Sequence, residues 1–242
     1  MTETKEKGSY QYYTDEGLEF TLEIPIFWET IYKGKPRERL YEEYIQMLNI
    51  VKKLPKDKII VDVGVNFGLF SIPVSKLGYR LVGFEPVYSN YIISTVNMFK
   101  NSCDNFHLCN YALSDKNEKA VIFVPECPDN ASLNKNAAVA NMIRKDYKEE
   151  EVTCVRFDDW IKDNPEFNNI GLIKLDTQGK EFDILNNSQE FLSQVKDIYL
   201  IVEYEEHLLK YEHTYEELDN LILSLDFKQV GKISNDKVWY KK

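Results

Sequence analysis

The fold is decided by the stretch 58-KIIVDVGVNFGLF-70. Ile59, Ile60 and Val61 form a short apolar, β-branched run of the kind that is buried in a parallel sheet. A glycine-containing turn follows at once, and a helix is predicted over residues 69–77. In an open α/β sheet, ligands bind beyond the carboxyl ends of the strands, where such loops lie. The stretch therefore predicts a strand, a ligand-binding loop and a helix.

The loop has the pattern D-x-G-x-N-x-G and differs from a dinucleotide-binding turn. The G-x-G-x-x-G fingerprint would need glycine at positions 64, 66 and 69, but Asn66 and Leu69 stand at the last two. Asp62 lies at the strand tip, where it would repel a pyrophosphate but would attract an ammonium or sulfonium group. S-adenosylmethionine carries both of these charges and no phosphate. The loop therefore favours that cofactor; the alternative is a structural turn in which Asp62 caps the helix.

A second acidic residue ends the next predicted strand. In the segment 82-VGFEP-86, Glu85 follows Asp62 by 23 residues. Adenosine-binding α/β domains place an acid here to accept hydrogen bonds from the ribose hydroxyls. Pro86 ends the strand because it has no backbone donor. A lone glutamate at a strand end would be unremarkable, but together with the glycine loop Glu85 indicates a nucleoside site.

Outward from these motifs, strands and helices alternate along the chain. This alternation predicts βαβ units around a mainly parallel sheet. The last two predicted strands are joined by only three residues, too few for a crossover helix, so we expect them to be antiparallel. The predicted strands cover 79–84, 106–113, 120–124, 152–157, 170–175, 198–203, 227–233 and 237–240, and the predicted helices cover 88–100, 180–192 and 215–225.

We interpret residues 1–55 as an N-terminal extension and 56–242 as the cofactor-binding domain. The tyrosine-rich segment 8–23 predicts short strands. A helix that opens at Pro36 and closes at Pro55 carries apolar residues at intervals of three and four. Since no linker follows it, this helix is expected to dock on the domain.

Length and composition exclude several classes of protein. The 242 residues suit one large α/β domain, and a hydrophobic content of 43% excludes a disordered chain. No apolar run approaches the ~20 residues that span a bilayer. A net charge of −10 with no basic stripe argues against a nucleic-acid partner. The four cysteines form no C-x-x-C pair and no secretory signal is expected, so we predict reduced thiols and a cytoplasmic protein.

These motifs, with two further segments, resemble the FkbM family of S-adenosylmethionine-dependent methyltransferases. The distinguishing segment is Lys-x-Asp-x-(Glu or Gln)-Gly-x-Glu, in which the family usually has Glu where this chain has Gln178. That difference removes one negative charge. The order and spacing agree from about residue 58 to 205, and residues 1–55 have no counterpart. The matching pieces are Asp62 to Ser71, Phe84 to Pro86, Asn97, Tyr111 to Asp115 and Ile173 to Glu181.

The resemblance implies a class I methyltransferase fold, Rossmann-like, with a mostly parallel seven-stranded sheet, a C-terminal antiparallel hairpin and helices on both faces. It also implies methyl transfer to a hydroxyl oxygen, commonly of glycans, glycosylated natural products or polyketides. Asp176 would lie beside the transferring methyl group. The ribose would be bound by Glu85 and Pro86, the methionine moiety by Asp62, Gly64, Asn66, Phe67 and Gly68, and the adenine by Asn110, Ala112 and Leu113.

A hydroxyl acceptor must lose its proton, so a base within hydrogen-bond reach is expected. Asp176 is the first candidate because it ends a buried strand; alternatively it caps the next helix. Glu203 and His207 are the next candidates. Lys174 shares a strand face with Asp176 and would either pair with it, which we favour, or polarise the acceptor. Mg²⁺ held by Asp176 and Glu203 is not favoured, because no ligand set at a recognisable spacing is present.

A long polar insertion over 125–151 is expected to shape the acceptor pocket, because long loops in compact domains often bind ligands. It contains Ser132-Leu133, which the family also carries. The tyrosines of the stretch Tyr10 to Tyr13, or Trp28, would contribute to the pocket or else fill the core. His107 and His213 are interpreted as structural.

Four hypotheses follow from the sequence. The leading one is an O-methyltransferase that acts on a carbohydrate hydroxyl of a small-molecule or oligosaccharide acceptor. The second is the same chemistry on a phenolic or polyketide hydroxyl. The third is an NAD-dependent oxidoreductase, which Asp62 and the missing third glycine oppose. The fourth is a catalytically silent binding module, which the intact loop and Glu85 oppose.

Overall fold

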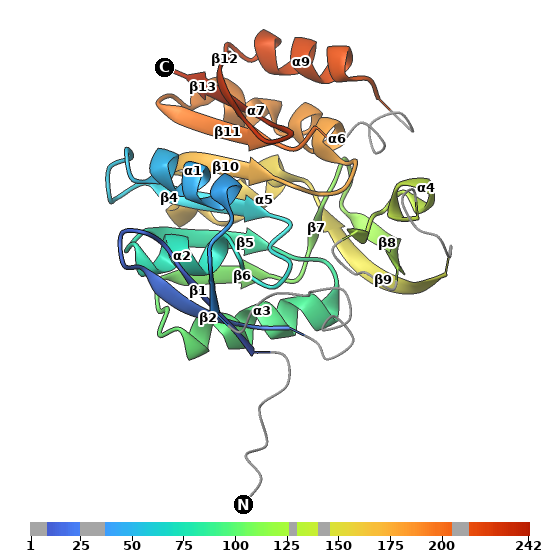
Figure 1. The fold of residues 1–242 in the computed structure, drawn as a ribbon. Helices are drawn as coiled ribbons and strands as arrows, with labels where there is room; N and C mark the ends of the chain where they lie inside the picture. The colour runs from blue at the N-terminus through green and yellow to red at the C-terminus, as the bar shows by residue number, and fades with distance from the viewer. Residues whose placement is uncertain (1–8, 25–36, 126–129, 140–145, 205–212) are drawn as a thin grey trace, which may run out of the picture.

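The computed structural model describes residues 9–24, 37–125, 130–139, 146–204 and 213–242. Its centre is a seven-stranded sheet that runs across the molecule (Figure 1). The order across the sheet is β12 (Lys228–Ile233), β13 (Asp236–Lys241), β11 (Ile198–Val202), β10 (Ile170–Leu175), β4 (Ile59–Val63), β5 (Arg80–Phe84) and β6 (Phe106–Cys109).

The strands β11, β10, β4, β5 and β6 are parallel, whereas β13 is antiparallel to both of its neighbours, β11 and β12. The predicted mostly parallel sheet with an antiparallel C-terminal hairpin is therefore confirmed. Because the last strand enters between β11 and β12, β12 becomes one edge of the sheet. The carboxyl ends of β4, β5, β10 and β11 meet along one side of the sheet.

Helices cover both faces of this sheet (Figure 1). Side chains alternate along the strands, so that Val61 of β4 packs into one hydrophobic core and Ile60 into the other. The core around Ile60 includes buried residues of α1 (Glu42–Val51), α2 (Ser71–Lys76) and α3 (Tyr88–Lys100). The core around Val61 takes up α5 (Phe157–Asp163), the 3₁₀ helix η3 (Pro165–Phe167), α6 (Glu181–Asn186), α7 (Gln189–Gln194) and α9 (Tyr215–Ser224).

Two small sheets flank the central one. The N-terminal sheet has the order β2-β1-β3, formed by β1 (Ser9–Tyr13), β2 (Glu19–Glu23) and β3 (Arg37–Arg39), and it packs into the same core as α1, α2 and α3. The second has the order β7-β9-β8, formed by β7 (Ala112–Leu113), β8 (Glu118–Pro125) and β9 (Tyr147–Val155), with the short helix α4 (Lys135–Ala138) beside it.

Several sequence-based boundaries are wrong, each for a physical reason. The helix predicted from Pro36 begins at Glu42, because residues 37–39 pair with β1 as a parallel strand. The strand predicted over 106–113 divides into β6 and β7, since β7 leaves the central sheet to pair with β9. The helix predicted over 180–192 is two helices, which separate at Asn187 and Ser188.

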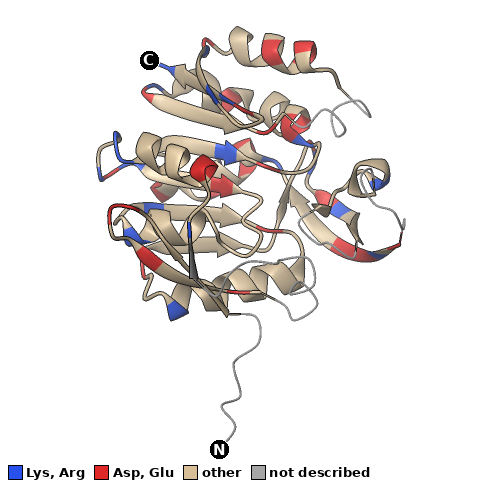
Figure 2. Cartoon of the chain, viewed as in Figure 1, with Lys and Arg blue, Asp and Glu red and all other residues tan. Residues whose placement is uncertain are grey.

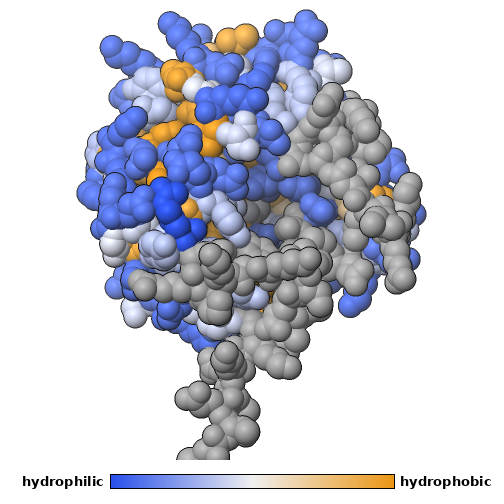
Figure 3. Space-filling model, viewed as in Figure 1, coloured by the Kyte–Doolittle hydropathy of each residue, from blue (hydrophilic) through white to orange (hydrophobic). Residues whose placement is uncertain are grey.

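The surface carries charged residues of both signs, as the sequence composition predicts. Acidic and basic residues are interspersed over the ribbon (Figure 2), and the described surface in the same view is mostly hydrophilic with small separate apolar patches (Figure 3). Within the described ranges, no helix is both long enough and apolar enough to cross a membrane.

Candidate active site

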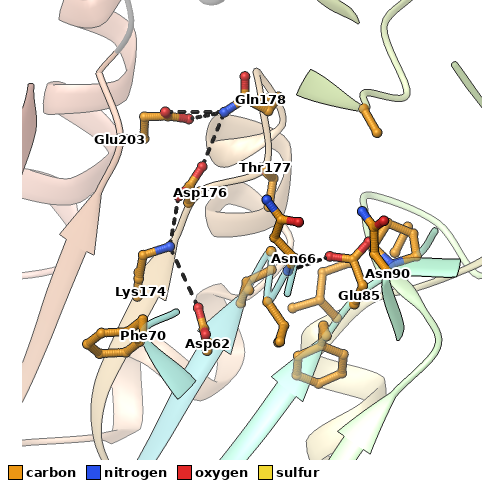
Figure 4. A pocket seen from close by; sticks show the side chains of 18 of the residues that line it. Asp62, Asn66, Phe70, Glu85, Asn90, Lys174, Asp176, Thr177, Gln178 and Glu203 are labelled. Atoms are coloured by element: carbon orange, nitrogen blue, oxygen red, sulfur yellow. Dashed lines mark hydrogen bonds and ion pairs between the residues drawn. The ribbon is translucent and has the colours of Figure 1, made fainter. Parts of the chain in front are cut away.

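A cavity of about 340 Å³ opens where the central strands end. Its walls come from the glycine loop after β4, the loop after β5, the segment after β10 and the end of β11 (Figure 4). Residues of the N-terminal segment and of the β8–β9 insertion complete it. The site thus lies at the carboxyl ends of the parallel strands, where the sequence places it.

Gly64 allows the loop after β4 to pass close to the end of β10. Its φ is +89°, and a Cβ atom at this position would lie 1.9 Å from the backbone oxygen of Asp176. Gly68, with φ of +96°, makes the turn into α2. Asn66 also has a positive φ, of +51°, and its N–H donates a hydrogen bond to Glu85 Oε2 at 2.8 Å. The loop is therefore shaped by its glycines and attached to β5.

Asp62 is buried at the tip of β4, with 1% of its surface exposed. Ser71 Oγ donates a hydrogen bond of 2.6 Å to Oδ2, while Oδ1 has no hydrogen-bond partner and lies 3.7 Å from Lys174 Nζ. Burial raises the pKa of Asp62, and the charge of Lys174 opposes that shift. The site therefore contains a carboxylate oxygen with unused capacity to accept a hydrogen bond.

Lys174 joins Asp62 to Asp176. Its Nζ donates a hydrogen bond of 2.8 Å to Asp176 Oδ2, and its side chain is 5% exposed. Burial lowers the pKa of Lys174, but Asp176 and Asp62 outweigh this and hold the pKa well above its ordinary value. Burial raises the pKa of Asp176, yet the ion pair with Lys174 outweighs it and lowers that pKa. The ion pair predicted for Lys174 is therefore present, and Asp176 is ionised at neutral pH.

Gln178 connects Asp176 to Glu203 (Figure 4). Its Nε2 donates hydrogen bonds to Asp176 Oδ1 at 3.2 Å and to Glu203 Oε2 at 3.1 Å. The Oε1 atom is buried and accepts no hydrogen bond. The backbone of Gln178 is held at φ of +58°, in a loop whose Thr177 and Gly179 N–H groups donate to the buried carboxylate of Glu181. Glu181 thus fixes the loop that carries Gln178.

Glu85 directly follows β5, at the end of the strand where the sequence predicts it, and is 5% exposed and faces the cavity with Asn90. Its carboxylate accepts hydrogen bonds from the N–H of Asn66 at 2.8 Å and of Val87 at 3.0 Å. Burial raises the pKa of Glu85 to about 7, against the effect of these two hydrogen bonds. Its charge therefore changes near neutral pH.

Most of the predicted site residues line the cavity. Besides the residues above, Phe67, Pro86, Ala112 and Leu113 do so. Gly68 and Asn110 do not: Gly68 shapes the turn, and the Asn110 amide donates to the backbone oxygens of Glu85 and Pro86, each at 2.9 Å. Asn110 therefore supports the loop after β5 and does not contact the cavity.

The histidines, and the tyrosines of the stretch Tyr10 to Tyr13, do not line the cavity where the structure describes them. His107 lies beside Phe167, with ring centroids 5.1 Å apart, and His213 stacks on Phe182 at 3.8 Å. Tyr10 and Tyr12 fill the core, while Trp28 and His207 lie outside the described residues. Of the described residues in the insertion, Ser132 and Leu133 are among those that line the cavity.

Three lining residues come from the N-terminal segment and were not predicted. They are Leu22 of β2 and Glu43 and Tyr44 of α1. No local pattern marks them, because their position depends on how the N-terminal sheet and α1 pack against the central sheet. The insertion is attached to the site by Ser132, whose Oγ donates a hydrogen bond of 2.8 Å to the backbone oxygen of Gln178. Among the residues that the structure describes, no group of three or more His, Cys, Asp or Glu could hold a metal.

Comparison with known proteins gives a consistent picture. A family model described as the methyltransferase FkbM domain matches residues 62–229. A curated protein named Methyltransferase 1, from Beauveria bassiana (strain ARSEF 2860), is 25% identical over 160 residues, which cover 60% of this chain and 64% of that protein. The match thus spans less than two thirds of that relative's length.

Two solved structures are similar at low sequence identity. A precorrin-6y C5,15-methyltransferase from Geobacter metallireducens GS-15 is 11% identical, with a TM-score of 0.48 over 82% of this chain and 88% of that chain. A magnesium protoporphyrin IX methyltransferase from Synechocystis PCC 6803, solved with bound SAM, is 10% identical, with a TM-score of 0.46 over 88% of each chain.

Proposed function

The chain belongs to the FkbM methyltransferase family, and on this premise we propose that it transfers a methyl group from S-adenosylmethionine to a hydroxyl oxygen of a carbohydrate. The acceptor is a glycan or a glycosylated metabolite. The observation that carries the proposal is the continuous series Asp62–Lys174–Asp176–Gln178–Glu203, which joins the glycine loop to the ends of β10 and β11 within one cavity.

The residues present fit S-adenosylmethionine. The buried Asp62 Oδ1, which has no hydrogen-bond partner, is an acceptor for the ammonium group of the methionine moiety. Gly64, Asn66 and Phe67 provide the rest of that surface, with Gly68 shaping the turn. Glu85 would accept hydrogen bonds from the ribose hydroxyls beside Pro86, and Ala112 and Leu113 would contact the adenine. When bound, the cofactor supplies a sulfonium-activated methyl group.

The remaining work of the chain is alignment and proton removal. An in-line displacement needs the acceptor oxygen held close to the methyl carbon, and such positioning supplies much of the rate enhancement. Asp176, which is ionised and one third exposed, accepts a hydrogen bond from the acceptor hydroxyl and takes its proton as the new bond forms. Lys174 holds Asp176 in place, and Gln178 sets the distance between Asp176 and Glu203.

The first test is calorimetric titration with S-adenosylhomocysteine, with NAD as the control ligand. We expect micromolar binding by the wild type, no binding of NAD, and loss of binding in Asp62→Ala. A screen of oligosaccharides and phenols for methyl transfer then follows, in which transfer to phenols alone would favour the phenolic alternative. No binding of S-adenosylhomocysteine by the wild type would refute the methyltransferase proposal.

A further inference from the structure

The cavity has two sides, which differ in the hydrogen-bonding groups they offer. Figure 4 shows Glu85 and Asn90 on one side and Asp176, Gln178 and Glu203 on the other. If the cofactor occupies the side of Glu85, as the proposed function requires, the acceptor occupies the other. We call the second side the acceptor wall; it consists of Asp176, Gln178 and Glu203, and we assign to it Glu43 and Tyr44, which line the same cavity.

Helix α1 brings Glu43 and Tyr44 to this wall. Tyr44 lines the same cavity as Lys174 and Asp176, so the start of α1 faces the site that holds their ion pair. Glu43 precedes Tyr44 on α1, is half-buried and also lines the cavity. The Glu43 side chain makes no hydrogen bond or ion pair with any residue that the structure describes. Glu43 thus offers an unused carboxylate from a segment that lies outside the family match at residues 62–229.

The acceptor wall offers two hydrogen-bond acceptors that no described residue engages. Glu43 contributes a carboxylate, and Gln178, 9% exposed, contributes the buried Oε1 atom that accepts no hydrogen bond. Three nearby donors are already engaged: Lys174 with Asp176, Gln178 Nε2 with Asp176 and Glu203, and Lys180 with Asp183. Five carboxylates against two lysines line the described part of the cavity. A phosphate or carboxylate would meet repulsion and find few free donors.

We propose that Glu43 and Gln178 Oε1 recognise the acceptor, and that the acceptor is a polyhydroxylated compound without an anionic group. Hydroxyl groups, or an amino group in place of one, donate to these oxygens. Tyr44 offers an aromatic side chain to the same cavity. The inference rests on the proposed function, and it narrows the carbohydrate acceptor to neutral or amino sugars, excluding uronic acids and sugar phosphates.

The experiment uses the full chain saturated with S-adenosylhomocysteine and three probes: methyl α-D-glucopyranoside, methyl α-D-glucosaminide and methyl α-D-glucuronide. Saturation-transfer NMR titrations give the dissociation constant of each. We expect the neutral and amino glycosides to bind and the uronide to bind at least about tenfold more weakly. Glu43→Lys should abolish the preference for the amino glycoside over the uronide, and Glu43→Gln should reduce it.

Glu42→Lys is the matched control, because Glu42 precedes Glu43 on the same helix, is exposed and pairs only weakly with Arg39 at the surface. This variant should keep the wild-type preference. Equal binding of the uronide and the neutral glycoside, equal effects of the two lysine substitutions, or binding of none of the probes would each overturn the inference. Failure to bind S-adenosylhomocysteine, measured first, would instead refute the proposed function.

Discussion

At the scale of single residues, Lys174, Asp62 and Asp176 show how charged side chains are accommodated in a buried site. The ammonium of Lys174 stands between the carboxylates of Asp62 and Asp176, and both lysine and Asp62 are almost wholly buried. Each charge would be costly to bury alone, and together they are tolerated because each has a partner. The arrangement fixes the side chain of Asp176, which the proposed mechanism requires to be in one position.

Replacing Lys174 with Met should therefore cost about 3–5 kcal/mol of stability, because two carboxylates lose their counter-charge. Chemical denaturation of the wild type and the variant measures this. The control is Lys237→Met, which breaks the partly exposed pair with Asp219 and should cost no more than about 1 kcal/mol. Equal losses in the two variants would contradict a special role for Lys174.

Glu85 predicts two opposite pH dependences. Its pKa is about 7 in the folded protein against an ordinary 4.5, so the folded state holds this proton more tightly than the unfolded chain. Its contribution to the stability of the cofactor-free protein is thus present below pH 4.5 and is lost as the pH rises to about 7. Affinity for S-adenosylhomocysteine should instead rise through pH 7, because the ionised carboxylate is the stronger acceptor for ribose hydroxyls.

Titration calorimetry and thermal unfolding between pH 5 and 9 measure both trends. Glu85→Gln cannot titrate, so the part of each dependence that is due to Glu85 should be absent in that variant. An affinity for S-adenosylhomocysteine that keeps its full pH dependence in Glu85→Gln would assign the titration to another group.

Gly64 is the residue at which the backbone leaves no room for a side chain. Gly64→Ala would place a Cβ 1.9 Å from the backbone oxygen of Asp176, so the end of β4 or β10 would have to move. We expect loss of S-adenosylhomocysteine binding and a large loss of stability. Gly17→Ala is the control, since φ there is a similar +85° but nothing lies within 4 Å, and only the strain of about 1–2 kcal/mol should appear. Similar melting temperatures for the two variants would contradict the clash.

At the scale of elements, Asn97 of α3 and Asn101, which caps the end of α3, attach the N-terminal sheet to the central domain. The Asn101 side chain bonds the N–H and the oxygen of Thr21, and the Asn97 side chain bonds those of Glu23 in the same way. Asn97 also donates a hydrogen bond of 2.9 Å to the backbone oxygen of Phe67. Asn97 therefore connects β2, α3 and the glycine loop, whereas Asn101 connects only β2 and α3.

This difference separates a stability effect from a binding effect. Asn97→Ala and Asn101→Ala should each lower stability by about 1–3 kcal/mol, because both leave backbone groups of β2 without a partner. Only Asn97→Ala should also weaken binding of S-adenosylhomocysteine, since it alone releases the glycine loop. Calorimetry at a temperature where both variants are folded tests the split, and equal affinities would refute it.

The elements also explain what the sequence could and could not reveal. The positions of strands β4 and β10, and of Asp62, Gly64 and Asp176, can be predicted from local patterns. Buried strands and glycine turns are each defined by residues that are adjacent in the sequence. The presence of Glu43 in the cavity cannot be predicted in this way, because it depends on packing between segments that are distant in the sequence. The start of α1 was predicted too early for the same reason: residues 37–39 pair with β1, a partner that no local pattern names.

At the scale of the whole molecule, the N-terminal segment shares a core with the central sheet. Tyr12, Leu22, Leu48 and Val51 are all at most 1% exposed and belong to the same cluster as Ile60 of β4. Leu22 also lines the cavity. The division of the chain at residue 55 therefore stays a prediction from the sequence. In the structure, residues before and after this position pack into the same hydrophobic core.

Deleting residues 1–55 should accordingly uncover a large apolar surface on the remaining domain. We expect a fragment that aggregates or unfolds without a cooperative transition and does not bind S-adenosylhomocysteine. Solubility, thermal unfolding and calorimetry test this. A soluble fragment that melts cooperatively and binds S-adenosylhomocysteine would show that 56–242 is an independent domain.

The position of β13 between β11 and β12 has a consequence for how the protein is made. On the ribosome, β11 and β12 emerge before β13, and they are not paired with each other in the finished sheet. Until residues 236–241 have been synthesised, the nascent chain thus carries the apolar strand β11 with one edge open to other chains. The cell's chaperones would be needed most during this interval, and a premature stop codon shortly before β13 would leave that edge open permanently.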